Sequence, residues 1–155
     1  MAPLDLRRLF ADPWEGEGVL WRPWWLRALP APATFRFRTE ITSGAGDSWE
    51  VRDATTLPDG TVRVRTMHCE QLAPDRLRLS AEDMPGGAEI RSHEDGFDFT
   101  PYVIRTPVLG PLRVPLRHHD RVRLEKGDAM SDTIELRLLG VRVGRVTMRL
   151  RRAPG

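Results

Sequence analysis

The stretch LRVPLRHHDRVRLE, from Leu112 to Glu125, indicates most clearly how this chain folds. Apolar residues recur at every second position for most of its length, and arginines occupy many of the positions between them. Because successive side chains of a strand point to opposite faces, this period of two predicts a long strand with one buried face. Pro115 falls inside the run and cannot donate a ladder hydrogen bond, so we expect a bulge or a gap there.

The same alternation appears in much of the remaining sequence, in short runs separated by polar turn residues. The clearest runs are Thr34–Thr42, Thr61–Leu72, Arg76–Glu82, Phe97–Ile104 and Asp132–Leu138. Asp59 and Gly60 form the strongest hairpin signal, since glycine readily adopts the positive φ of a tight turn. Gly144 breaks the alternation of the last run, which predicts a turn or a bulge.

About eight to ten short strands of this kind predict an all-β fold, either a sandwich or a barrel. Short turns between consecutive runs favour pairing between neighbours in sequence. A single antiparallel up-and-down β-barrel is the simplest result, because closure removes exposed strand edges.

Helix signals are confined to the N-terminus. Residues Leu4–Phe10 place Leu6, Leu9 and Phe10 on one side of one or two helical turns. Asp12 precedes a proline, which pushes it out of the helical region and ends the helix. We predict one short N-terminal helix that packs on one end of the barrel or plugs it.

The composition indicates one globular domain. The chain has 155 residues, of which 40% are hydrophobic and 30% are charged, and we predict a single β-barrel domain over residues 1–155. No stretch approaches the roughly 20 apolar residues of a membrane helix, and the N-terminus lacks the apolar core of a secretion signal. Cys69 is the only cysteine, which excludes an intrachain disulfide and a multi-cysteine metal site. We therefore expect a soluble, cytoplasmic protein.

The charge pattern argues against nucleic-acid binding. Lys126 is the one lysine among 24 basic residues, and 22 acidic residues reduce the net charge to +2. The arginines are spread along the whole chain at alternate positions, as on the solvated face of strands, whereas a nucleic-acid site needs a basic cluster. We expect no nucleic-acid partner.

Several short motifs follow one another along the chain: Trp14–Gly18, the Asp59–Gly60 hairpin, Ala81–Gly86, Pro101–Val103 and Leu139–Thr147. In this order they resemble an uncharacterised bacterial family of lipocalin-like, calycin-type β-barrels. The resemblance implies a lipocalin-like barrel and hence a small apolar ligand, and it implies no catalytic residues. It also implies that Trp21 contacts Arg149 or Arg151 of the last strand. The chain departs from the family in a tryptophan- and proline-rich insertion, Trp21–Pro32.

Four polar residues fall on faces that we expect to line the interior. His118 and Asp120 are in phase with the apolar residues of their strand, and His68 and Glu70 are in phase with Val62 and Val64 of theirs. We predict that these side chains form a polar ligand-recognition site in an apolar pocket. Two alternatives stay open: a hydrogen-bond network at wet strand ends, or a divalent-metal or haem site that uses the histidines.

Apolar and aromatic residues complete the predicted site. Phe35, Phe37 and Leu116 are expected on the interior wall. Trp24 and Trp25 belong to the stiff, proline-rich insertion, where they could pack beneath the barrel end, cover the ligand entrance as a lid, or contact a membrane surface or another protein.

These features favour one function and leave two others open. The leading prediction is a lipocalin-like carrier that binds a hydrophobic or amphipathic small molecule in the barrel lumen. The alternatives are an isomerase or cyclase that uses His118 and Asp120 for proton transfer, and a filled barrel that acts as an interaction module. We predict no cofactor and no bound metal. The ligand's identity, any catalytic residue and the oligomeric state are left open.

Overall fold

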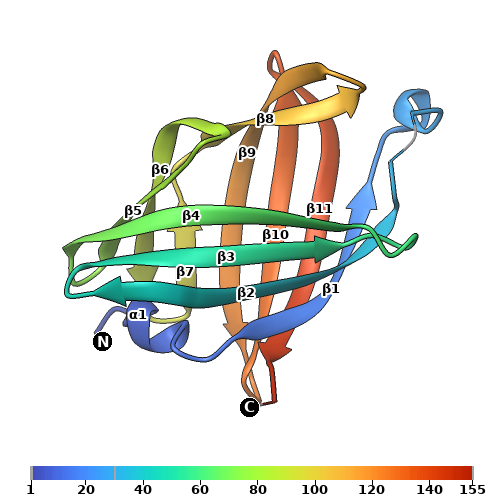
Figure 1. The fold of residues 1–155 in the computed structure, drawn as a ribbon. Coiled ribbons are helices and arrows are strands. Elements are labelled where there is room, and N and C mark those ends of the chain that lie inside the picture. Colours follow the sequence, from blue (N-terminus) through green and yellow to red (C-terminus); the bar gives the residue numbers. More distant parts are fainter. Residues whose placement is uncertain (1, 30, 155) are drawn as a thin grey trace.

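β-strands make up most of the computed structural model, which describes residues 2–29 and 31–154 (Figure 1). Within these residues one α-helix, α1, spans Leu6–Leu9 and one 3₁₀-helix, η1, spans Trp24–Leu26. The strands are β1 (Trp14–Trp21), β2 (Thr34–Ala45), β3 (Ser48–Thr56), β4 (Val62–Ala73), β5 (Arg76–Ala81), β6 (Met84–His93), β7 (Gly96–Phe99), β8 (Tyr102–Leu109), β9 (Leu112–Glu125), β10 (Ala129–Leu138) and β11 (Val141–Arg152). Neither of the two described helices has the length and apolar character needed to cross a membrane.

The strands close into an antiparallel barrel. In the described part of the chain, eleven strands form one sheet, but β7 and β8 share one place in the wall, so the barrel has ten positions. β7 pairs with the second half of β9, and β8 pairs with the first half. Pairing of β9 with β10 completes the ring. Figure 1 shows β2, β3 and β4 crossing in front of β9, β10 and β11, as the two opposed walls of the barrel. The predicted all-β antiparallel barrel is confirmed.

The helix α1 closes one end of this barrel. Asp5 caps it, because its Oδ1 accepts a hydrogen bond of 3.1 Å from the backbone N–H of Arg8. Leu6 and Leu9 are buried in the core, and the indole Nε1 of Trp14 donates a 2.8 Å hydrogen bond to the carbonyl oxygen of Leu9. The predicted short helix at a barrel end is present.

Turn chemistry predicted from the sequence is found at two places. Gly60 has a φ of +86°, and Asp59 Oδ1 accepts a 2.9 Å hydrogen bond from the N–H of Thr61 in the hairpin between β3 and β4. The register between β10 and β11 shifts just after the pair formed by Leu136 and Gly144. The predicted irregularity at Gly144 is therefore a β-bulge.

The first half of β9 differs from the prediction. Pro115 pairs in register with Arg105, and the irregularity of the β8–β9 pair lies further along, between Pro107 and Leu109. The bulge expected at Pro115 itself is therefore wrong. Leu112 begins the strand in the predicted phase but is exposed.

The prediction for β4 is wrong in its phase. Met67 and Cys69 are buried in the core, whereas Val62 and Val64 are exposed. Val62 and Val64 would place one face of β4 inward, whereas Met67 and Cys69 would place the opposite face inward. The face that carries Met67 and Cys69 is the one that packs in the core. The valines lie near the Asp59 hairpin, where Val62 pairs with the last residue of β3.

The tryptophan-rich segment lies beside the barrel wall, beyond the end of β1 (Figure 1). Trp24 and Trp25 are 78% and 49% exposed, so core packing of these rings is excluded. Arg22 stabilises the conformation of this segment, because its guanidinium donates hydrogen bonds to the carbonyl oxygens of Leu26, Leu29 and Ala31. Pro30 lies outside the described residues.

Tryptophan–arginine contacts join the first strand to the last. The guanidinium of Arg152 lies 5.2 Å from the ring centre of Trp14, and that of Arg142 lies 5.3 Å from the ring centre of Trp21. The contact of Trp21 with Arg149 or Arg151 that the family resemblance implied is therefore wrong: Trp21 contacts an arginine near the start of β11, and Trp14 contacts one near its end.

Candidate functional site

A cavity of about 220 Å³ occupies the barrel interior. Its wall is mainly apolar and includes Phe37, Trp49, Val51, Leu79, Val122 and Met148. An engineered apolar cavity of about 150 Å³ holds a benzene molecule. The space in this barrel is therefore sufficient for one ring with a short side arm.

Aromatic rings form a continuous line along one side of this cavity. Phe10, just after α1, packs edge-on against Phe97 at a centroid distance of 5.8 Å. Phe97 contacts Phe99 at 5.8 Å, and Phe99 contacts Tyr102 at 5.7 Å. Tyr102 stacks on His118 at 5.0 Å, with an interplanar angle of 15°. The line leads from the closed end of the barrel to a group of polar side chains.

His118 enters this group as a neutral imidazole. Its Nδ1 lies 3.0 Å from the carbonyl oxygen of Leu116, and because a carbonyl can only accept, Nδ1 carries the proton. Nε2 therefore keeps its lone pair. Burial is the main cause that lowers the pKa of His118 from 6.5 to about 4.

Asp120 and Asp132 form a carboxyl pair beside Tyr102. They come from neighbouring strands, since Asp120 lies opposite Ile134 and Asp132 lies opposite Val122. The hydroxyl of Tyr102 donates a 2.8 Å hydrogen bond to Asp120 Oδ2. Burial is the main cause that raises the pKa of both carboxyl groups, and the neighbouring Asp120 charge raises the pKa of Asp132 further. The pair therefore holds one shared proton.

Asp53 faces this pair from β3, on the opposite wall of the barrel. Burial raises its pKa from 3.8 to about 6, although Thr39 and Arg65 both favour its ionised form. The charge of Arg65 is shared, because its Nε also donates a 3.1 Å hydrogen bond to Asp83. Apart from the proton that Asp120 and Asp132 share, four buried carboxyl oxygens accept no hydrogen bond within the described residues: Asp53 Oδ1, Asp83 Oδ1, Asp120 Oδ1 and Asp132 Oδ1. Asp83 does not line the cavity, so the other three belong to this site.

A second hollow, of about 350 Å³, adjoins the cavity. The two spaces share Phe37, Asp53, Arg65 and Ile104 as lining residues. Other arginines surround the outer hollow: Arg63, Arg105 and Arg113. In the described part of the chain, no three His, Cys, Asp or Glu side chains are arranged to hold a metal ion.

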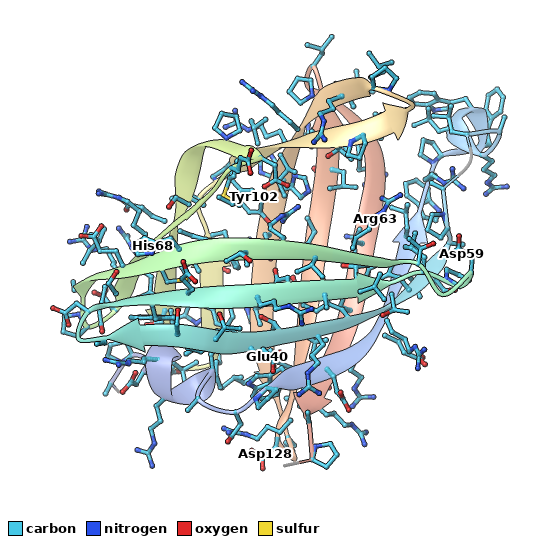
Figure 2. The ribbon with its side chains drawn as sticks, in the orientation of Figure 1. Glu40, Asp59, Arg63, His68, Tyr102 and Asp128 are labelled. Carbon is cyan, nitrogen blue, oxygen red and sulfur yellow. The ribbon has the colours of Figure 1, made fainter. Side chains whose placement is uncertain are left out.

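The structure brings together only some of the residues predicted for the site. His118, Asp120 and Phe37 line the cavity. His68 lies on the outer face of β4 (Figure 2), and Glu70 is exposed on the same face. His68 Nε2 is 3.0 Å from Ser48 Oγ. Their predicted place in the lumen is wrong because the phase of β4 is opposite to the expected one.

The remaining predicted residues lie away from the cavity. Phe35 is half-buried, and its ring covers Gly18, where an added Cβ would lie 2.2 Å from the ring. Leu116 is half-buried and does not line the cavity. Trp24 and Trp25 are absent from its lining too, so they form no lid over it in this conformation.

Among the polar residues that the structure adds to the site are Asp53, Asp132 and Tyr102, which we did not predict. The alternation of the sequence could have indicated each of them, because each lies an even number of positions from apolar residues that are expected to face inward. Asp53 is in phase with Trp49 and Val51, Asp132 with Met130 and Ile134, and Tyr102 with Ile104. An acidic or hydroxyl-bearing residue in phase with buried neighbours is thus the pattern that marks the interior polar group.

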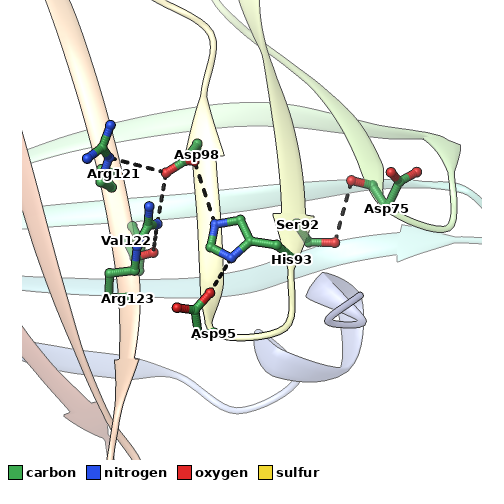
Figure 3. A network of polar contacts seen from close by, with 8 residues as sticks. All are labelled: Asp75, Ser92, His93, Asp95, Asp98, Arg121, Val122 and Arg123. Carbon is green, nitrogen blue, oxygen red and sulfur yellow. Dashed lines mark hydrogen bonds and ion pairs between the residues drawn. The ribbon is translucent and has the colours of Figure 1, made fainter. Parts of the chain in front are cut away.

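A separate polar network ties β6, β7 and β9 together (Figure 3). Asp98 accepts a 2.8 Å hydrogen bond from Arg123 and lies 3.6 Å from both Arg121 and His93. His93 also contacts Asp95 in the turn between β6 and β7. These contacts hold β7 against β9, directly before the break that lets Tyr102 enter the interior.

The comparisons with known proteins support the fold. No family model matches the chain, and no curated protein matches it. Among solved structures, it is similar to Rv2717c from M. tuberculosis, whose crystal structure superposes with a TM-score of 0.64 at 14% sequence identity. The match covers 99% of this chain and 99% of that chain. A likeness at this level of identity shows a shared barrel fold.

Proposed function

We propose that this protein binds a compact apolar or amphipathic small molecule inside its barrel. The observation that carries the proposal is the cavity of about 220 Å³, whose wall is apolar except for one group of polar side chains. Such a combination is typical of small-molecule sites, in which apolar walls supply affinity and a few polar groups fix orientation. It agrees with the carrier role that the lipocalin-like motifs imply.

The adjoining hollow is the entrance that we assign to this site. It shares four lining residues with the cavity, and two of them, Asp53 and Arg65, carry polar groups to the boundary between the spaces. α1 closes the other end of the barrel. A ligand would therefore enter with its apolar part directed toward Phe97 and Trp49.

Trp49 provides a direct test. It is buried and lines the cavity, whereas Trp24 is exposed on the outer segment. We expect phenethyl alcohol and propylbenzene to change the tryptophan fluorescence of the wild type in a saturable way. The change should be lost in Trp49→Phe and kept in Trp24→Phe.

Thermal unfolding supplies a second readout that does not depend on tryptophan. A ligand at about 100 times its Kd stabilises the folded state by about 2.7 kcal/mol, which corresponds to roughly 5–10 °C in Tm for a chain of this size. A barrel that is filled and binds nothing would show neither a saturable fluorescence change nor a shift in Tm, and the proposal would then be wrong.

The polar group favours a second candidate, an enzyme that transfers protons on an apolar substrate. Nε2 of His118 has a free lone pair, and the Asp120–Asp132 pair holds a proton on the same cavity wall. A base and an acid at one apolar site are the elements of an isomerase or cyclase. Under this hypothesis, His118→Gln abolishes turnover of a substrate that still binds; unchanged turnover would exclude it.

A further inference from the structure

The carboxyl groups of the interior are unfavourable for folding in the absence of a ligand. Asp120 and Asp132 are each only 8% exposed, and an ionised carboxylate is costly to bury unless an opposite charge compensates it. Among the described residues that line the cavity, one is a cation, Arg65, and it is already paired with Asp83. The interior polar group therefore has more negative than positive charge.

We propose that the cavity recognises a protonated primary amine carried on a compact apolar group, with the ammonium held among Asp53, Asp120 and Asp132. This inference rests on the proposed ligand-binding function and names the ligand's chemical class. Once the proton shared by Asp120 and Asp132 has left, the three carboxylates offer three shielded oxygens without a protein donor, and a primary ammonium has three N–H donors.

The aromatic line beside the carboxyl groups supports the same ligand. Phe99, Tyr102 and the neutral ring of His118 lie next to Asp120 on the cavity wall. Aromatic faces attract cations, and they do so more strongly in a site shielded from water. The space admits a benzene-sized ring with a short arm, which matches an arylalkylamine such as phenethylamine.

The arginines of the outer hollow do not reverse this preference. Arg63, Arg105 and Arg113 line the outer hollow and are absent from the lining of the cavity itself. Charges in contact with solvent are screened over about 8 Å at physiological ionic strength, whereas buried charges are screened much less. The carboxyl groups in the cavity wall therefore dominate once the amine has entered.

Binding of the amine also changes the protonation of the site. Without a ligand, Asp132 keeps the proton that it shares with Asp120. The incoming ammonium brings its own positive charge, so the shared proton leaves to the buffer and the amine stays protonated. Two other carboxylates act on the pair: Asp98 raises the pKa of Asp120, and Asp53 raises the pKa of Asp132.

Calorimetric titration of the wild type with three matched ligands tests the inference: phenethylamine, phenethyl alcohol and phenylacetate. We expect the amine to bind about tenfold or more tightly than the alcohol, as a charge-assisted hydrogen bond requires, and phenylacetate to bind most weakly. Titrations in two buffers of different ionisation enthalpy should show proton release with the amine and none with the alcohol.

Two variants and one control locate the effect. Asp132→Asn keeps the shape of the side chain and a hydrogen-bond donor, so the fold should persist while amine affinity falls about tenfold and alcohol affinity stays unchanged. Asp53→Asn provides the same test from the opposite wall if Asp132→Asn is unstable. Glu70→Gln is the control, because Glu70 lies on the outer face of β4.

The outcomes separate this inference from the proposed function. Equal binding of the alcohol and the amine, or tighter binding of phenylacetate, would overturn the amine inference and leave the ligand-binding function in place. A response to Ca²⁺ or Zn²⁺ but not to the amine would also overturn it. Binding of none of the three compounds would contradict both.

Discussion

Replacement of Asp53 by asparagine should stabilise the protein at neutral and alkaline pH. Burial raises the pKa of Asp53 from 3.8 to about 6, even though Thr39 and Arg65 partly compensate its charge. A tenfold change in proton affinity is worth about 1.4 kcal/mol, so the ionised carboxyl group destabilises the folded state by about 3 kcal/mol. Asparagine fills nearly the same volume without the charge and should recover much of this free energy.

The effect has a defined pH window. Below pH 3.8 the carboxyl group is protonated in the folded and the unfolded state, so its contribution to stability is fully present. As the pH rises from 3.8 through about 6, the unfolded state releases the proton first, and stability is lost. The difference between Asp53→Asn and the wild type should therefore be near zero at low pH and reach its full size above about pH 7.

Urea unfolding followed by tryptophan fluorescence measures this difference. Curves for the wild type and Asp53→Asn at about pH 4 and about pH 8 give free energies of unfolding by linear extrapolation. Contributions of titrating groups remote from Asp53 cancel in the comparison of the two proteins. Loss of the Asp53 charge also lowers the pKa of Asp132, which adds to the gain at high pH. Glu70→Gln, an exposed carboxyl-to-amide change, should show no such pH-dependent gain. An Asp53→Asn protein that is less stable than the wild type at pH 8, or equally shifted at both pH values, would refute the reasoning.

Three further predictions follow from the packing. Trp14→Phe leaves the Leu9 carbonyl without its buried donor and should cost about 1–3 kcal/mol in urea unfolding, whereas Trp24→Phe on the surface should stay within about 0.5 kcal/mol. Leu79→Ala should cost about 2–5 kcal/mol and the half-buried Leu116→Ala clearly less; equal losses would contradict the core described above. Burial raises the pKa of the Cys69 thiol to about 12, so a thiol-specific reagent should leave the folded protein unlabelled and modify it only in urea; rapid labelling of the native protein would place this thiol at the surface.

The sequence predicts the fold class well because hydrophobic alternation and turn chemistry are local. The hairpin at Asp59 and Gly60 depends on the positive φ that glycine readily adopts, and the bulge at Gly144 follows from the break in the alternation of the last run; both are found. The short N-terminal helix follows from the spacing of Leu6 and Leu9 in the same way. None of these features needs information about which strands meet across the barrel.

The candidate site is predicted less completely because it depends on contacts between distant strands. The phase of β4 is ambiguous in the sequence, since Val62 and Val64 suggest one inward face and Met67 and Cys69 suggest the other. Leu112 is exposed at the start of β9, and alternation alone does not specify which parts of a strand are covered. Asp53 and Asp132 gain their significance only because the barrel brings them to the same cavity.

A crystal structure of the protein with bound phenethylamine tests the central claim most directly. We predict that the ring lies inside the barrel between Trp49, Phe97 and Tyr102, and that the ammonium lies within hydrogen-bond distance of Asp120 and Asp132. Electron density for the ligand confined to the outer surface, with the cavity empty or filled by rearranged side chains, would contradict the account.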